Sequence, residues 1–577
     1  MAVQISSISV SRLSRAPLYW DVIAIVLVLG ALVFFAQASS GLMVPLTELE
    51  EHPISLDPTN LPGFAVRTTL RMLVAMVLSL LFTFTYATWA AKSRRAEVLL
   101  IPLLDILQSV PILGFISITV IYFMSLAPGL VLGAEFAAVF AIFTSQAWNM
   151  AFSFYQSLRT VPEELLEASR NFRFGAWMRF WRLEVPFAMP ALVWNMMMSM
   201  SGGWFFVVAS EAISVGDTTV TLPGIGSYIA TAIAQRDLAA VGWAIGTMLI
   251  VILIYDQILF RPLVAWADRF RFEQDIGVEP PRSWVLTALR RSRLAAWALA
   301  PLAAVWRWSY RAFGRRRRAR NAWARDDGEA DRGTWIWYGA TAVAALVAAR
   351  EIVLFTLQGV TVSEAGTTVL LGFATMARVF VLIAMASAIW VPIGVWIGLR
   401  PSLARIAQPI AQFMAAFPAN LLFPIAVSGI VALGLDPNIW LSPLMILGTQ
   451  WYILFNVVAG ASAIPSELRY VGANLHLHGW FWWRRIGLPA IFPFYVTGAI
   501  TASGGSWNAS IVAEVASWGQ DRLQAYGLGA YIAEATEAGD FHRILLGIAV
   551  MSAFVVVINR AFWRPLYYYA ERKFRLG

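Results

Sequence analysis

Long apolar runs recur along almost the whole chain, and they leave few options for its fold. Hydrophobic residues make up 59% of the 577 residues and charged residues 13%, and the mean hydropathy is +0.66. A soluble domain of this size would have too little polar surface to cover itself. We therefore expect an all-α polytopic membrane protein, because a helix satisfies its own backbone hydrogen bonds in lipid.

About twelve segments are expected to cross the membrane, and the charges between them set the orientation. Lys92, Arg94 and Arg95 follow the second segment, whereas the acidic connection 39–63 has no Lys or Arg. The positive-inside rule places the loop with Lys92, Arg94 and Arg95 in the cytoplasm and the connection 39–63 outside. Both chain termini are then expected in the cytoplasm. The expected segments are 18–38, 65–90, 98–126, 130–158, 186–215 (broken at Gly202 and Gly203), 238–260, 335–357, 373–399, 406–433, 439–461, 489–517 and 541–562.

One polar, basic stretch occurs twice between these runs, at 161–186 and 464–489. Adding 303 converts one copy into the other without a gap, as in Pro162 and Pro465, Glu164 and Glu467, Trp177 and Trp480, and Pro186 and Pro489. Each copy begins with a Pro that suits the first turn of a helix and with acidic residues that suit its N-terminus. The pattern predicts a short helix outside the membrane, where a soluble partner could push on it.

The duplication extends over two halves, 1–268 and 335–577, joined by a basic linker, 269–334. Adding 307 takes Arg71 to Arg378, and adding 303 takes Glu211 to Glu514. Each half has six expected spans, an even number, so both have the same orientation. Such parallel repeats are related by an axis along the membrane normal. We expect a pathway along that pseudo-two-fold axis.

Ionisable groups inside the spans are candidates for that pathway, because they are costly in lipid and usually face a cavity or a partner. Arg71 and Arg378 could meet an anion, but we favour the alternative that each pairs with a carboxylate such as Glu211 or Glu514. Two tryptophans beside glycine pairs could form a gate or pack in the core. The candidate pathway residues are Arg71, Arg378, Asp105, Gln412, Gln146, Gln450, Trp204, Trp507, Glu211 and Glu514.

Several chemistries lack the residues that they need. The chain has no Cys and four His, which argues against disulfides, thiol catalysis and a metal site built from these side chains. Neither of its two lysines, Lys92 and Lys573, lies in a P-loop sequence, so any ATP hydrolysis must come from another chain. The net charge of +9 comes from arginines between apolar segments, which indicates membrane orientation and not nucleic-acid binding.

With these marks in place, the chain resembles the permease subunits of type I ABC importers, most closely the branch for nitrate, taurine and alkanesulfonates. The repeated stretch is similar to their cytoplasmic coupling loop, the EAA loop. Further marks are the paired arginines, the Pro-rich third span of each half and the fifth span that ends with Trp and Glu. An external Gly-x-Gly-x-Tyr-Ile motif, Gly224–Ile229 and Gly527–Ile532, completes the set.

The resemblance implies a fused permease without its own ATPase site or cofactor, in a bacterial inner membrane. It would pass a small, anionic solute (nitrate, sulfonate, taurine, bicarbonate or similar) from a binding protein to the cytoplasm. Its partners would be two ABC ATPase subunits, identical or different, which carry ATP and Mg. The implied coupling residues are Glu163, Glu164, Glu167, Ala168, Arg173, Trp177, Arg182, Glu467, Arg469, His476, Trp480 and Arg485.

Two departures from the family pattern stand out. Arg173 and His476 replace the Gly usual in the middle of the loop, and the family Glu matched by Glu167 becomes Tyr470 in the second copy. These changes suggest that the two halves bind their ATPase partners unequally.

Two other classes compete with the importer. A secondary transporter could also have parallel six-helix repeats and polar groups at the midplane, but it would not need the paired cytoplasmic helices. A membrane-bound transferase or hydrolase would need a cluster of acid, base or metal-binding residues that the sequence does not offer.

Overall fold

The computed structural model describes residues 54–109, 112–215, 218–270, 283–292, 300–301, 304–309, 312 and 332–574. The first expected span, 18–38, and most of the linker lie outside these residues. Within them, eight helices are long and apolar enough to cross a membrane, or ten if each of two bent helix pairs is one span. The expectation of a nearly all-α membrane protein is confirmed.

The first half is built from helices and one hairpin. After a short 3-10 turn, 58–60, its elements are α4 (Leu61–Phe82), α5 (Thr88–Lys92), α6 (Arg94–Ser109), α7 (Ile112–Leu126), α8 (Val131–Arg159), α9 (Glu163–Asn171), α10 (Ala176–Arg179), α11 (Val185–Glu211), β1 (Ala212–Val215), β2 (Thr218–Thr221), α12 (Ile225–Ala234), α13 (Leu238–Tyr255) and α14 (Arg261–Ala267). Single π-helical turns at 83–87, 180–184 and 256–260 join some of these helices. In the linker, α15 spans Trp284–Arg291.

The second half repeats this order. Its elements are α17 (Arg332–Gly359), α18 (Val362–Gly398), α19 (Pro401–Ala416), a 3-10 turn (Ala419–Leu422), α20 (Phe423–Leu433), α21 (Pro437–Trp440), α22 (Leu444–Leu447), α23 (Gln450–Ser462), α24 (Ser466–Asn474), α25 (Gly479–Trp482), α26 (Leu488–Ala513), β3 (Val515–Trp518), β4 (Asp521–Gln524), α27 (Leu528–Glu537), α28 (Phe541–Ile558) and α29 (Arg564–Phe574). Its π-helical turns, 483–487 and 559–563, lie 303 residues after two of those in the first half.

Three expected spans differ in detail from single straight helices. The third is divided into α6 and α7, the ninth bends by 78° between α19 and α20, and the tenth bends by 45° before α23. Prolines lie within or at the start of the helix that precedes each of these breaks: Pro102 in α6, Pro409 in α19 and Pro437 in α21. A Pro cannot donate a hydrogen bond to the preceding turn. The expected break at Gly202 and Gly203 is wrong, because α11 runs through both residues as one helix.

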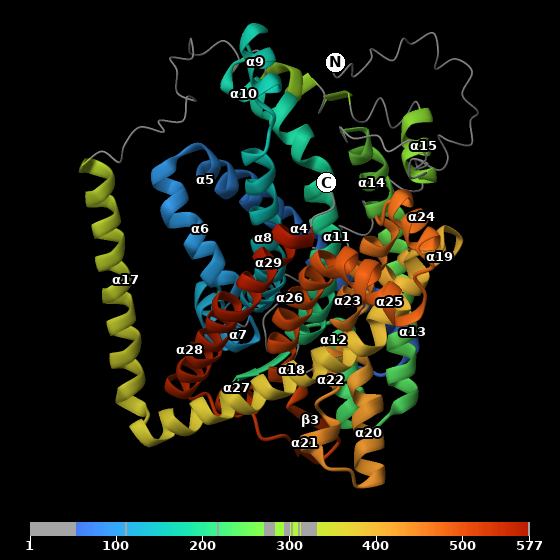
Figure 1. Ribbon diagram of the computed structural model, residues 1–577. Helices are drawn as coiled ribbons and strands as arrows, with labels where there is room; N and C mark the ends of the chain where they lie inside the picture. Colours follow the sequence, from blue (N-terminus) through green and yellow to red (C-terminus); the bar gives the residue numbers. More distant parts are fainter. Residues whose placement is uncertain are drawn as a thin grey trace.

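Each half ends its fifth span in a two-stranded antiparallel hairpin, β1–β2 and β3–β4. Figure 1 shows α9 and α10 at the top of the molecule and β3 near the bottom. We call the end that holds α9 and α24 the loop end, and the end that holds the hairpins the hairpin end. Asp237 and Asp540, which are equivalent, cap α13 and α28 by accepting hydrogen bonds from backbone N–H groups in the first turn.

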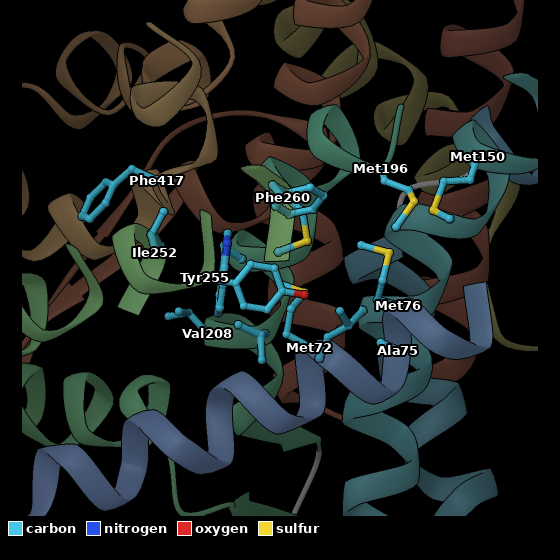
Figure 2. Packing of buried hydrophobic residues seen from close by; sticks show 14 of the residues in the cluster. Met72, Ala75, Met76, Met150, Met196, Val208, Ile252, Tyr255, Phe260 and Phe417 are labelled. Atoms are coloured by element: carbon cyan, nitrogen blue, oxygen red, sulfur yellow. The ribbon is translucent and has the colours of Figure 1, made fainter. Parts of the chain in front are cut away.

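The two halves interlock instead of lying side by side. The helices α17 and α28 of the second half pack on α6, and α28 also packs on α7, while α13 of the first half packs on α20. The first-half core includes Phe417 and Leu421 from the second half. Figure 2 shows Met76, Met150 and Met196, from α4, α8 and α11, pointing into the same part of this core. Flexible thioether side chains fill irregular gaps between such helices.

Close helix packing in the second half depends on glycines that face a neighbouring helix. A Cβ atom at Gly398 of α18 would lie 2.6 Å from the carbonyl oxygen of Val458 in α23. Gly366, on the same helix, has open space where a Cβ atom would lie.

We therefore expect Gly398→Ala to destabilise the purified protein by about 1–3 kcal/mol through overpacking. Gly366→Ala should leave stability unchanged or raise it by about 0.4–1 kcal/mol. Thermal unfolding of both variants in detergent checks this, and equal effects would contradict the close α18–α23 contact.

Candidate functional site

A buried ion-pair cluster fastens the hairpin end of the first half. Arg71 of α4 donates from Nη1 to Glu211 Oε1 of α11 at 2.6 Å. It also donates to both carboxylate oxygens of Glu135 in α8, each at 2.6 Å. The side chains of Arg71 and Glu211 are 3% and 0% exposed. Removing charges from water is costly, so such a group is tolerated only with close partners.

The same carboxylate holds the segment after the hairpin. Thr68 donates to Glu211 Oε1 at 2.7 Å and accepts from the backbone N–H of Ile225 at 3.1 Å. The N–H of Gly226 donates to Glu211 Oε2 at 2.7 Å. A Cβ at Gly226 would lie 2.2 Å from the carbonyl oxygen of Val208, so this close approach requires glycine. This contact explains the second Gly of the motif.

The second half repeats the cluster with one substitution. Arg378 pairs with Glu514 at 3.0 Å, and Thr375 donates to Glu514 at 2.8 Å. Adding 303 to Glu135 gives Asn438, which accepts from Arg378 Nη2 at 3.4 Å. A neutral amide thus replaces a carboxylate, and the Arg378 side chain is 15% exposed.

Backbone contacts in the second cluster follow those of the first. Leu528 N–H donates to Thr375 at 2.9 Å, and Ala530 N–H donates to Glu514 at 3.1 Å. The tyrosine of the motif also reaches back to the start of the half. Tyr228 donates to the carbonyl oxygen of Leu56 and Tyr531 donates to Glu364. Burial raises the pKa of Tyr531 to about 12, so its hydroxyl stays protonated at neutral pH.

These contacts agree with the interpretation that Arg71 and Arg378 brace the bundle. Both guanidinium groups bind protein carboxylates at the hairpin end. Sequence reasoning named Glu211 and Glu514 as partners but missed Glu135 and Thr68. Thr68 has a detectable signal, because Thr375 lies 307 residues later.

A cavity of about 340 Å³ lies between the two halves. Its walls come mainly from α8 and α11 of the first half and from α26 of the second, with Tyr452 of α23 and Val555 and Ile558 of α28 beside them. Among the residues described, its lining includes no charged side chain. Its polar lining consists of amides, hydroxyls and glycines: Gln108, Thr144, Ser145, Asn149, Ser199, Gly202, Gly448, Thr449, Tyr452, Thr501, Ser503, Gly504, Gly505, Asn508 and Asn559.

Of the candidate pathway residues, Trp507 lies in the cavity wall, and it is almost fully buried. Trp204 packs edge-on against Tyr255 in the core, with ring centroids 5.4 Å apart. It therefore lies away from this cavity.

The candidate glutamines also point elsewhere. Gln146 Nε2 lies 3.0 Å from Met72 Sδ, and Gln450 accepts from the indole N–H of Trp390 at 2.9 Å. Gln412 Nε2 lies 3.3 Å from Met197 Sδ. The side chain of Asp105 lies outside the described residues. Ser145 and Asn149, on a different face of α8 from Gln146, line the cavity instead.

At the loop end, the repeated stretches form α9–α10 and α24–α25. The expected helix start is present in both copies, since Pro162 and Pro465 directly precede the first helical residue. Glu163, Glu164, Glu167 and Arg182 are exposed in the first copy, as are Glu467, His476, Trp480 and Arg485 in the second, while Ala168, Trp177 and Arg469 are half-buried. Arg469 donates to the carbonyl oxygen of Ile464.

The replaced glycines keep a conformation that favours glycine. Arg173 has φ 51° and His476 has φ 49°, both in the left-handed region. Each follows a short helix, where a left-handed residue commonly ends the last turn. The loop geometry is thus the same in both copies, although neither has Gly there.

The first copy is held by charges that the second lacks. Glu184 lies 2.7 Å from Lys92 Nζ at the end of α5 and 3.2 Å from Arg179 Nε. Adding 303 takes Arg179 to Trp482 and Glu184 to Gly487. In the second copy the Trp482 ring packs on Gly487, where a Cβ would lie 2.6 Å from it.

The linker also contacts the first copy. Trp306 packs edge-on against Trp181, with centroids 4.7 Å apart, and the Trp177 indole N–H donates to Ser309 at 3.4 Å. In the second copy Trp480 and Phe481 are 68% and 69% exposed. In the first copy Phe172 is 74% exposed, whereas Trp177 is half-buried, so the two loop-end surfaces differ in their exposed tryptophan area.

Comparison with known proteins finds one family in both halves. The family described as "Binding-protein-dependent transport system inner membrane component" matches residues 83–265 and 390–575. The bicarbonate transport system permease protein CmpB of Synechococcus elongatus is 27% identical over 188 residues, which are 32% of this chain and 64% of that protein. The match thus spans less than two thirds of the relative.

The names of two further relatives give solutes other than bicarbonate. The nitrate import permease protein NrtB of Synechocystis is 26% identical over 203 residues, 35% of this chain and 70% of that protein. The glycine betaine/proline betaine transport system permease protein ProW of Escherichia coli is 25% identical over 193 residues, 33% of this chain and 50% of that protein.

The two clusters make a prediction about their arginines. Arg71→Ala leaves Glu211 and Glu135 without their shared cation and should destabilise the purified protein by about 3–5 kcal/mol. Arg378→Ala should destabilise it by a smaller amount, about 1–3 kcal/mol, because Arg378 has one carboxylate partner and is more exposed. Thermal unfolding in detergent measures both. A stable protein that has lost uptake in either variant would instead indicate contact with the solute.

Proposed function

Because the chain belongs to the family of binding-protein-dependent transport system inner membrane components, with two family segments in one polypeptide, we propose that it is the fused permease of an ATP-driven importer. The two halves enclose one pathway, and each half presents one coupling segment to an ATPase. A solute-binding protein docks at the hairpin end, which faces outward. The loop end and both termini lie in the cytoplasm.

The observation that carries this proposal is the pair of short, polar helices at equivalent positions of the two halves. α9 and α24 expose acidic residues in their first turns and connect through short helices and π-helical turns to α11 and α26. Those two long helices supply Ser199 and Gly202, and Ser503 and Gly504, to the cavity wall. A force on either short helix would therefore reach the cavity.

The two coupling segments are proposed to bind their ATPase partners unequally. α24–α25 offers Tyr470, Leu475, Trp480 and Phe481 as exposed apolar surface. The first copy instead has more exposed acidic residues, and its aromatic side contacts the linker. Docking of the second copy would depend more on apolar burial, and docking of the first more on charge.

The cavity supports a small solute as cargo. Its amide and hydroxyl groups can exchange hydrogen bonds with an oxyanion, while the described lining residues carry no fixed charge that would trap it. Binding that is favourable enough to enter and weak enough to leave is a requirement for passage. We propose a small anion such as nitrate, bicarbonate or a sulfonate, with selectivity set largely by the binding protein.

The coupling role is tested by reversing charge on the two short helices. Glu164→Lys and Glu467→Lys together should reduce co-purification of the ATPase by at least about tenfold, which corresponds to about 1.4 kcal/mol of binding free energy. Glu534→Lys, an exposed carboxylate at the hairpin end, is the matched control and should leave ATPase binding unchanged. Unchanged ATPase binding by the double variant would argue against coupling through these helices.

The pathway is tested by filling the cavity from its wall. Gly504 lines the cavity and has open space where a Cβ would stand. Gly504→Leu should reduce uptake by about tenfold or more, because it narrows the only passage proposed, and assembly should persist. Gly242→Leu, at an equally open position outside the cavity, should transport normally. Normal uptake by the Gly504 variant would exclude this cavity as the pathway.

A further inference from the structure

The helix α17 stands at the edge of the molecule with little protein around it. Figure 1 shows it upright at the far left, joined to the rest by α18. It packs on α28 and α6, and 6% of its membrane-spanning stretch is buried. Most of its surface therefore faces lipid or a further partner.

Two adjacent charges lie near the middle of this helix. Arg350 and Glu351 are about 20 Å along the axis from Trp337 and about 13 Å from Gly359, at 1.5 Å per residue. They pair with each other at 2.6 Å, yet their side chains are 68% and 62% exposed. Charged groups within the membrane are rare because lipid cannot solvate them, and they normally face a partner or a wet cavity.

The charges lie on the side of α17 that faces away from the bundle. The less exposed residues, Tyr338, Thr341 and Thr356, lie on the opposite side at 100° per residue. Val343 and Val347, 60% and 53% exposed, share the outward side with Arg350 and Glu351. The packing of α17 on its own chain therefore leaves the ion pair uncovered.

The internal ion pair satisfies these groups only in part. A guanidinium has five N–H donors, and within the described residues Arg350 donates from Nη1 to Glu351. Glu351 accepts this bond through Oε1, and its second carboxylate oxygen can accept a hydrogen bond from another donor. A surface that supplied one carboxylate and one guanidinium at the same depth would complete both groups.

We propose that α17 is a contact between two copies of this chain in the membrane. A two-fold axis along the membrane normal would place two α17 helices parallel, with their charges at equal depth. Arg350 of each copy would then pair with Glu351 of the other, so one surface is complementary to itself. Ala340 and Ala344, which lie within about 20° of Glu351 around the helix, allow the backbones to approach closely.

The apolar segment 18–38 of the same chain fits these charges poorly as a partner. It contains no Lys or Arg, and its one carboxylate, Asp21, lies near its start. It could not supply the guanidinium that Glu351 requires at mid-depth.

A charge exchange between two differently tagged copies tests the proposal. Wild-type copies expressed together should co-purify from membranes in mild detergent. Arg350→Glu in both copies, or Glu351→Arg in both, should reduce co-purification by at least about tenfold, because like charges then face each other. A mixed pair, one copy with Arg350→Glu and the other with Glu351→Arg, should recover it.

The mixed pair also controls for misfolding, since two misfolded chains would not recover association. Failure of the wild-type copies to co-purify overturns the proposal. The proposal is also overturned if copies that both carry the same substitution co-purify at the wild-type level, or if the mixed pair does not recover co-purification.

The absence of Cys from the chain permits an independent measurement in intact membranes. With one Cys introduced per chain, a disulfide dimer can join only two copies. Val347→Cys, on the outward side, should give disulfide dimers on mild oxidation, whereas Ile352→Cys, on another side of α17 and 44% exposed, should not. Equal cross-linking at both positions, or none at Val347, would overturn the contact.

Discussion

Each half of this protein depends on one carboxylate buried at the hairpin end of a long helix. Glu211 and Glu514 each accept hydrogen bonds from an Arg, a Thr and the backbone after the hairpin. A buried carboxylate without these partners would be strongly destabilising, so the two elements that supply them, α4 and α12 or α18 and α27, are held to the long helix. In each half the long helix, the hairpin and the helix after it, α12 or α27, take their positions from this contact.

The same long helices link the two ends of the molecule. α11 runs from the coupling segment α9–α10 past the cavity to Glu211, and α26 does the same from α24–α25 to Glu514. One end of each helix is therefore fixed by an ion pair, while the other is joined to an exposed segment by a π-helical turn. In the mechanism that we propose, an ATPase moves the loop end, and the long helices transmit this movement to the cavity. Interlocking of the halves means that movement of one must be accommodated by the other.

The sequence predicts the architecture well because its signals are long and repeated. Apolar runs indicate the spans, and the offsets of 307 in the early spans and 303 in the later part indicate the duplication, which the family match in both halves confirms. Local details were less accessible. Gly202 and Gly203 suggested a break, but α11 is packed tightly enough on its neighbours to continue through both residues. Polarity alone does not show which face of a helix lines a cavity: the sequence predicts Gln146 in the pathway, whereas Ser145 and Asn149 of the same helix line the cavity.

Other contacts were missed because they arise between distant residues. Glu135 meets Arg71 across 64 residues of sequence, and the Lys92–Glu184 pair joins two helices that no local pattern connects. The second half has Asn438 and Gly487 at the positions equivalent to Glu135 and Glu184, so the repeat itself does not reveal these ion pairs. These ion pairs make the first half more charged and the second more apolar, which is the physical basis for expecting the two halves to bind their ATPase partners unequally.

The central claim is that this chain moves its solute only when a nucleotide-hydrolysing partner works on its loop end. Reconstitution of the purified chain into liposomes, with binding protein and nitrate or bicarbonate outside, measures this directly. The account predicts uptake when the ATPase partner and ATP are present inside, and none when either is omitted. Uptake driven by an ion gradient without the ATPase would contradict it.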